Sequence, residues 1–119
     1  MTKDEIISNL PEWFRVKDTE ALLEARGFLA LHIAEVTEKL SRKEVEHPKV
    51  KAERKLTVMS STLAHSGTVQ EREAKAHEEC KDLIMREAKL EGEIKGLRHY
   101  VESMKEVTNA IAAYLKQTT

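Results

Sequence analysis

The feature that most constrains this chain is a heptad pattern in its C-terminal half. Two series of residues recur at intervals of seven: Cys80, Glu87, Ile94, Val101, Thr108 and Leu115, and then Leu83, Leu90, Leu97, Met104 and Ile111. The second series lies three positions after the first, which is the spacing of a and d positions in a helix that packs against other helices. No proline interrupts residues 69–117, so one long helix is predicted there, with a break near residues 76–82 as the alternative because the stripe is weak.

Capping signals mark where this helix and a short N-terminal helix begin. Thr68 followed by Glu71 is a capping box, and it predicts the start of the long helix. Thr2 and Glu5 form the same pattern and predict a helix over residues 2–10, which Pro11 either ends or extends by a turn.

The segment between them predicts two further helices. Asp18 is a good N-cap for a helix that fades at His47, because a residue before proline is pushed out of helical geometry. Pro48 is then suited to the first turn of a second helix, and Gly67 to the left-handed residue that follows its end. The predicted core stripes are Leu22, Ala25, Leu29, Ile33, Val36 and Leu40 in the first helix, and Ala52, Leu56, Met59 and Leu63, flanked by Val50 and Val58, in the second.

These elements predict an all-α protein, an antiparallel helical bundle or coiled coil with a long C-terminal helix. Residues 1–17 form an N-terminal arm and residues 18–119 a helical coiled-coil domain. With 4% aromatic residues, the apolar content is that of helix seams rather than of a thick globular core. Trp13 and Phe14 are predicted either to clamp the arm onto the helices or to anchor a partner, since Trp is favoured at interface hot spots.

The composition favours a cytoplasmic protein without a membrane segment. The net charge is −1, the single cysteine cannot form an internal disulfide, and no apolar run is long enough to span a bilayer. Five histidines are present, but only His77 and Cys80 are spaced as possible metal ligands, and zinc needs two more. No activated nucleophile or phosphate-binding glycine loop can be assembled. The sequence therefore predicts no metal, cofactor, small-molecule substrate or catalytic residue, and no enzymatic activity.

Two surfaces are predicted to make contacts with other molecules. The heptad seam looks too long to be covered by the upstream helices, so a homo-oligomer, with a dimer favoured, is expected through Leu83, Leu90, Ile94, Leu97, Val101, Met104, Ile111 and Leu115. Residues 39–68 carry seven basic and three acidic side chains, and weak nucleic-acid contact is the sharper interpretation of this stretch, beside a merely solvated helix corner. The candidate contacts are Lys43, Lys49, Lys51, Arg54 and Lys55.

The run SGTVQEREAKA at residues 66–76 resembles a stretch in small helical proteins of tailed bacteriophages. Those proteins are encoded near single-strand-annealing recombinases of the Erf or RecT type, and their helix order is similar over about residues 19–117. They often have a tyrosine shortly after the stretch, where this chain has His77, two glutamates and Cys80.

The resemblance implies an accessory interaction protein of phage DNA recombination or replication, located in the bacterial host cytoplasm. Such a protein would act through its helical surfaces on a recombinase or a single-strand-binding protein. Two other classes remain open: a virion scaffold or DNA-packaging component, and a small phage inhibitor of a host defence or polymerase complex.

Overall fold

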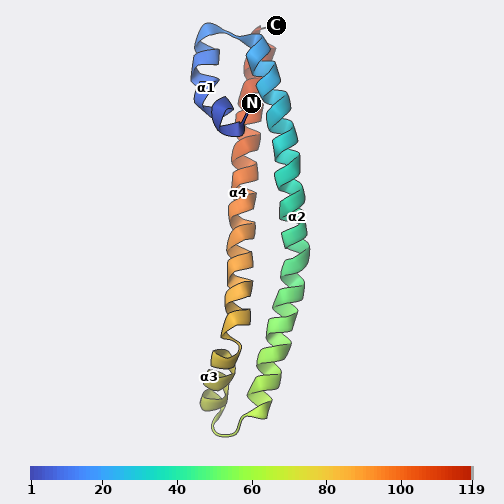
Figure 1. The fold of residues 1–119 in the computed structure, drawn as a ribbon, viewed down its shortest axis with the longest axis vertical. Coiled ribbons are helices and arrows are strands. Elements are labelled where there is room, and N and C mark those ends of the chain that lie inside the picture. Colours follow the sequence, from blue (N-terminus) through green and yellow to red (C-terminus); the bar gives the residue numbers. More distant parts are fainter. Residues whose placement is uncertain (119) are drawn as a thin grey trace. The chain divides into compact units, whose positions relative to one another are not determined.

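The computed structural model describes residues 1–118, and within this range the chain is helical without any strand. The helices are α1 (Lys3–Val16), α2 (Thr19–Ala64), α3 (Val69–Glu79) and α4 (Lys81–Thr118), as labelled in Figure 1. The predicted all-α class with a long C-terminal helix is therefore confirmed. Contacts divide the chain into two units, which we call unit 1 (Met1–Lys39 and Leu97–Thr119) and unit 2 (Leu40–Gly96).

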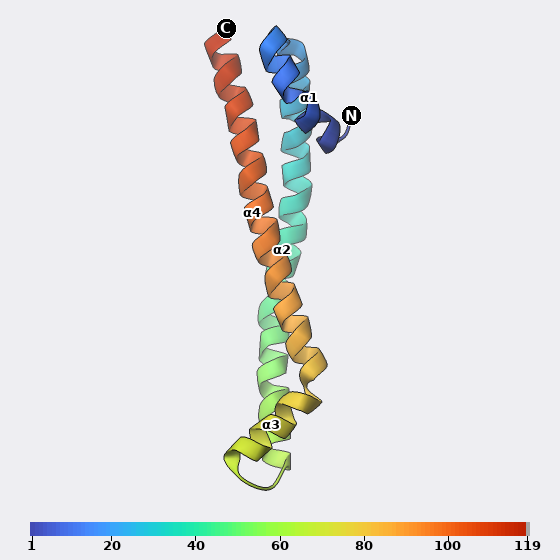
Figure 2. The same ribbon diagram turned by 90° about the vertical axis from the view of Figure 1, so that its left-hand side faces the viewer.

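Unit 1 contains an apolar core that is formed by three helical segments. Figures 1 and 2 show α1 folded back beside the start of α2, with the end of α4 next to them. Trp13, Phe14 and Tyr114 pack at the margin of this core. Its buried members are Ile6, Leu10, Leu22, Ala25, Leu29, Met104, Ile111 and Leu115.

The ends of α1 follow the local capping chemistry. Thr2 Oγ1 accepts a hydrogen bond from the backbone of Glu5 at 3.2 Å, and Glu5 accepts one from the backbone of Thr2 at 3.4 Å, so the predicted capping box is confirmed. The helix continues past Pro11 to Val16 and closes at Lys17, which adopts a left-handed conformation with φ of 56°. The helix in the N-terminal arm is therefore longer than the one predicted over residues 2–10.

Helix α2 is continuous, and the prediction that a second helix starts at Pro48 is wrong. Pro48 lies inside the helix with its ring exposed. Proline lacks the N–H that would bond the Glu44 carbonyl, at a cost of about 3 kcal/mol in a helix interior. Lys43 before it and Arg54 after it both bond to α4, and we attribute the continuity of α2 to these tertiary contacts.

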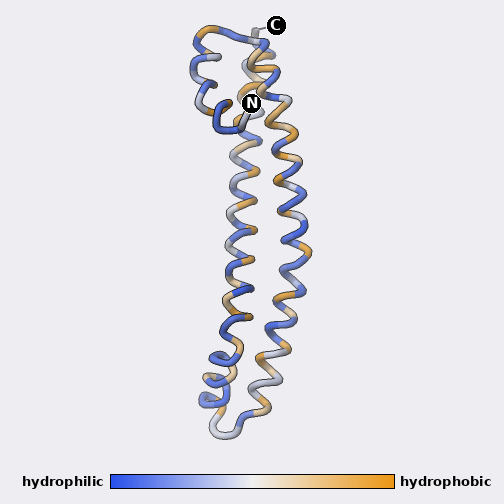
Figure 3. The backbone as a smooth tube through the Cα atoms, viewed as in Figure 1, coloured by the Kyte–Doolittle hydropathy of each residue, from blue (hydrophilic) through white to orange (hydrophobic). Residues whose placement is uncertain are grey.

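The predicted long third helix is divided, because α3 ends at Glu79 and α4 starts at Lys81. Cys80 between them has φ of −97° and ψ of 12°, outside helical geometry. Figure 2 shows α3 lying at an angle to α4 across the end of α2, and Figure 3 shows that α3 is mostly hydrophilic. A segment with so few apolar residues cannot continue the seam, so the alternative of a break near residues 76–82 is confirmed.

The loop before α3 agrees with the sequence. Gly67 has φ of 109°, a conformation that side chains rarely adopt, and Thr68 Oγ1 accepts a hydrogen bond from the Glu71 backbone at 3.2 Å.

The heptad seam of α4 is covered by the chain itself. Six of its eight predicted interface residues are buried, and Leu83 and Leu97 are partly buried. The buried residues are Leu90 and Ile94 in unit 2, and Val101, Met104, Ile111 and Leu115 in unit 1. These side chains are not free to bind a second copy, so homo-oligomerisation stays a prediction that has to rest on other residues.

Leu29 and Leu31 provide a matched test of the unit 1 core, since Leu29 is fully buried and Leu31 is 69% exposed. Leu29→Ala is expected to lower the free energy of unfolding by about 2–5 kcal/mol, because it leaves a cavity. Leu31→Ala is expected to change it by less than about 0.5 kcal/mol. Urea denaturation of both variants checks this, and equal losses would contradict the assigned orientation of α2.

Candidate functional site

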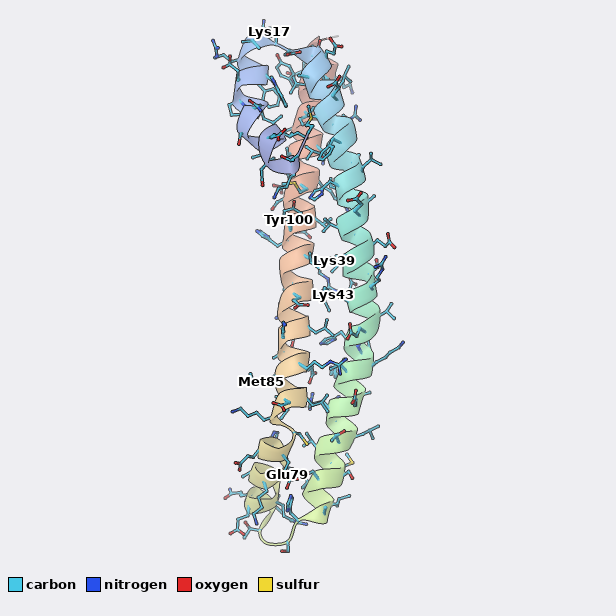
Figure 4. The ribbon with its side chains drawn as sticks, in the orientation of Figure 1. Lys17, Lys39, Lys43, Glu79, Met85 and Tyr100 are labelled. Atoms are coloured by element: carbon cyan, nitrogen blue, oxygen red, sulfur yellow. The ribbon has the colours of Figure 1, made fainter. Side chains whose placement is uncertain are left out.

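Unit 2 combines buried apolar side chains with charged contacts between α2 and α4. Arg54 Nε donates to Glu87 Oε2 at 2.6 Å, and Arg54 Nη2 donates to Glu87 Oε1 at 3.3 Å. Lys43 Nζ donates to Glu93 Oε2 at 2.6 Å, and Figure 4 labels Lys43 on the side of α2 that faces α4. Residue 43 of α2 pairs with residue 93 and residue 54 with residue 87, so these two segments run in opposite directions within unit 2.

The Arg54–Glu87 pair occupies a position of the seam where an apolar residue would otherwise stand. The hydrogen bond from Arg54 holds the pKa of Glu87 below its ordinary value, although partial burial opposes this. The same bond raises the pKa of Arg54. Since a carboxylate at a helix seam is costly without a partner, Arg54 has to face α4.

This constraint decides which side of α2 faces outward in unit 2. Leu56 follows Arg54 by two residues, which places it about 200° further round the helix. The side chains of Leu56, Met59 and Leu63 are accordingly 67%, 61% and 75% exposed. The predicted core stripe from Ala52 to Leu63 is therefore wrong, and Val50, which was assigned to its flank, is the buried residue.

The exposed stripe borders a groove between α2 and α3, which we call the α2–α3 groove. Its volume is about 370 Å³. Met59 and Leu63 contribute apolar surface, whereas Lys55 on α2 and Glu73 on α3 carry opposite charges on its two walls. The lining residues are Arg54, Lys55, Val58, Met59, Thr62, Leu63, Glu73 and His77.

Helix α3, one wall of the groove, makes a polar contact with α2 through Glu79, which Figure 4 labels. Ser61 Oγ donates to Glu79 Oε2 at 2.6 Å, and His65 Nε2 lies 2.7 Å from Glu79 Oε1. The hydrogen bond from Ser61, followed by that from His65, lowers the pKa of Glu79. Ala76 of α3 and Cys80, which follows this helix, are buried apolar residues.

The predicted nucleic-acid contacts do not form one cluster. Lys43 and Arg54 are engaged by Glu93 and Glu87, and α2 has no corner where the basic stretch was placed. The remaining three, Lys49, Lys51 and Lys55, are exposed. Lys51 and Lys55 are one turn apart on the same side of α2, whereas Lys49 lies on another side.

The two aromatic residues proposed as a partner anchor are used within unit 1. The rings of Phe14 and Tyr114 meet edge to face with centroids 5.0 Å apart, and Tyr114 Oη donates to the Phe14 carbonyl at 3.4 Å. Trp13 is half-buried against the same core. This placement agrees with a clamp that fastens α1.

His77 is exposed and Cys80 is buried. Across residues 1–118, no three His, Cys, Asp or Glu side chains are grouped so that they could hold a metal ion. In the same range, no helix is both long and apolar enough to cross a membrane.

No protein-family model, curated protein or solved structure matches this chain.

The depressed pKa of Glu87 predicts a pH dependence of stability. A carboxylate with a lowered pKa stabilises the fold above its ordinary value, 4.5, and that contribution is lost as the pH falls through the folded-state value. Wild type should melt at a higher temperature than Glu87→Gln at neutral pH, and the difference should shrink in acid. Thermal melts of both proteins across this range check it, and a pH-independent difference would refute the ion-pair explanation.

Binding to single-stranded DNA is expected to be weak, independent of sequence and reduced by salt, because a few lysines release few counterions. The variant Lys51→Glu with Lys55→Glu should abolish it. A matched charge change in unit 1, Arg26→Glu with Lys105→Glu, should leave most of the binding. Band shifts at low salt compare the three proteins, and an absence of any wild-type shift would remove DNA from the function.

Proposed function

We propose that this chain is a non-enzymatic interaction protein that binds a helix of a partner protein in the α2–α3 groove. The observation that carries the proposal is the exposure of Met59 and Leu63 beside that groove. Soluble proteins commonly expose single apolar residues. Large apolar residues on neighbouring turns of a helix, beside a groove, instead mark an interaction site.

A helix is the occupant that suits the shape and chemistry of this surface. An amphipathic helix lays its apolar side chains, spaced three and four residues apart, into a groove between helices. Methionine is flexible and polarisable, so Met59 can adapt to different apolar anchors. Lys55 and Glu73 have no ion-pair partner among the described residues. A bound helix is therefore expected to place an acidic side chain against Lys55 and a basic one against Glu73.

The arrangement of polar groups near the groove supports a non-enzymatic role. The hydroxyl of Ser61 contacts Glu79 Oε2, and the imidazole of His65 contacts Glu79 Oε1. A serine nucleophile needs a base that accepts its proton, and here the hydroxyl donates to Glu79, whose lowered pKa makes it a weak base.

The proposed partner is a recombinase or a single-strand-binding protein of a phage recombination or replication system. The resemblance to small phage proteins supports this class of partner. The stretch that carries the resemblance, residues 66–76, makes up the loop and most of α3, and so contributes one wall of the groove.

Affinity capture from infected or lysogenic bacteria tests the proposal. The groove variant is Met59→Asp with Leu63→Asp, and the matched control is Leu23→Asp with Leu31→Asp, two exposed leucines of α2 in unit 1. Wild type and control should retain the recombinase or single-strand-binding protein, whereas the groove variant should lose it, because a charge in an apolar contact is desolvated without a partner. Circular dichroism establishes that both variants keep wild-type helicity.

The identity of the captured protein separates the remaining classes. Recovery of capsid or packaging proteins would replace the proposed role with that of a virion scaffold, and recovery of a host defence or polymerase complex would replace it with that of an inhibitor. Equal capture of the same protein by wild type and the groove variant would show that the groove is not the binding site. Titration with the purified partner, with the groove variant at least about tenfold weaker, completes the test.

A further inference from the structure

A second seam lies on the side of α2 that points away from α4 in unit 2. Val45, Lys49, Ala52 and Leu56 are all exposed and follow one another at spacings of four, three and four residues. These spacings keep the residues on one face of a helix and are those of alternating a and d positions. We call these residues, together with Glu53, the outer α2 face. Val45 and Leu56 are its large apolar members, 62% and 67% exposed.

The charges on the outer α2 face are complementary to each other. Lys49 and Glu53 lie one turn apart along its edge, are exposed, and make no ion pair in the part of the chain that the structure describes. Glu46, another carboxylate near this edge, is engaged by Arg86 at 3.2 Å. The face thus presents one free cation and one free anion beside two apolar side chains.

We infer that a second copy of this chain covers the outer α2 face, with the two α2 segments antiparallel about a two-fold axis between residues 50 and 51. This register places Val45 against Leu56 of the partner subunit, and it brings Lys49 to Glu53 of the partner subunit. Because the interface is isologous, each contact occurs twice. Ala52 lies near the axis, where its small side chain admits the aliphatic part of Lys49 from the other copy.

Self-pairing accounts for both charges, which a helix of uniform charge does not. An acidic helix on this face would satisfy Lys49 and leave Glu53 against like charge, and a basic helix would do the reverse. A second copy supplies both counter-charges from the same residues and also matches large apolar side chains to each other. The apolar contact is short, so the dimer is expected to be weak and to depend on concentration.

This inference does not depend on the α2–α3 groove. None of the residues that line the groove belongs to the outer α2 face, although Met59 and Leu63 of the groove continue its spacing beyond Leu56. A groove that binds no partner would leave the dimer in place, and a monomeric chain would leave the groove available.

A charge-swap experiment tests the register. Lys49→Glu alone creates two carboxylate–carboxylate contacts across the axis, and Glu53→Lys alone creates two contacts between lysines. Each variant should therefore dimerise about tenfold more weakly than wild type. A mixture of the two variants restores both attractive pairs, so it should form a heterodimer at wild-type strength. Sedimentation velocity gives the association of each sample, and native mass spectrometry distinguishes heterodimer from homodimer by mass.

Two control sets keep the outcome unambiguous. Lys105→Glu and Glu106→Lys make the same charge changes on α4 in unit 1, and neither variant nor their mixture should alter dimerisation. Leu56→Asp should give a monomer, whereas Leu31→Asp, at an exposed leucine of unit 1, should not. Circular dichroism of every variant separates loss of dimer from loss of fold. A monomeric wild type at high concentration, or a mixture no stronger than its components, would overturn the inference.

Discussion

The ion pair between Arg54 and Glu87 is the contact on which the arrangement of unit 2 depends. A carboxylate at a seam position of α4 has to be matched by a cation, and Arg54 is the residue of α2 that reaches it with two hydrogen bonds. Turning Arg54 toward α4 settles the rotation of α2 about its own axis. The apolar residues that follow, Leu56 and Met59, then point away from α4. The exposed surface proposed to bind other molecules is thus a consequence of a polar contact inside the unit.

The two units differ in the contacts that they bury and in the apolar surface that they expose. In unit 1, apolar and aromatic side chains from α1, α2 and α4 meet in one core, and Ile6, Leu22, Leu29 and Ile111 are fully buried in it. In unit 2, Lys43–Glu93 and Arg54–Glu87 lie across the helices, and much of the large apolar surface of α2 is outside. Charged contacts at a helix interface contribute less net stability than apolar burial but specify register and rotation. The charged contacts of unit 2 therefore contribute less to its stability than apolar contacts would, but they define which way its exposed apolar face points.

Several features were predictable because they depend on short stretches of sequence. The capping residues Thr2, Asp18 and Thr68 bond to backbone groups within three residues, so no distant part of the chain can alter their effect. The misjudged features depend on contacts between helices. Pro48 favours a helix start locally, yet α2 passes through it. The core stripe of α2 in unit 2 was assigned to the longer apolar side chains, although Glu87 in the facing seam already indicated that the inward position had to carry a base.

The sequence by itself determined the all-helical class, the caps at Thr2, Asp18 and Thr68 and the inward direction of the α4 seam, because heptad spacing and capping are local and act whatever the helix packs against. It also contained apolar residues on two sides of α2 in unit 2, the stripe from Ala52 to Leu63 and the flanking Val50 and Val58, and its periodicity favoured the side that proved to be exposed. Tertiary structure alone decided that Val50 and Arg54 face α4 while Leu56 and Leu63 face outward. It likewise decided that the α4 seam is covered within one chain. The physical reason is that the rotation of a helix is a property of the pair it forms, and in unit 2 the carboxylate of Glu87 in the facing seam is matched by Arg54.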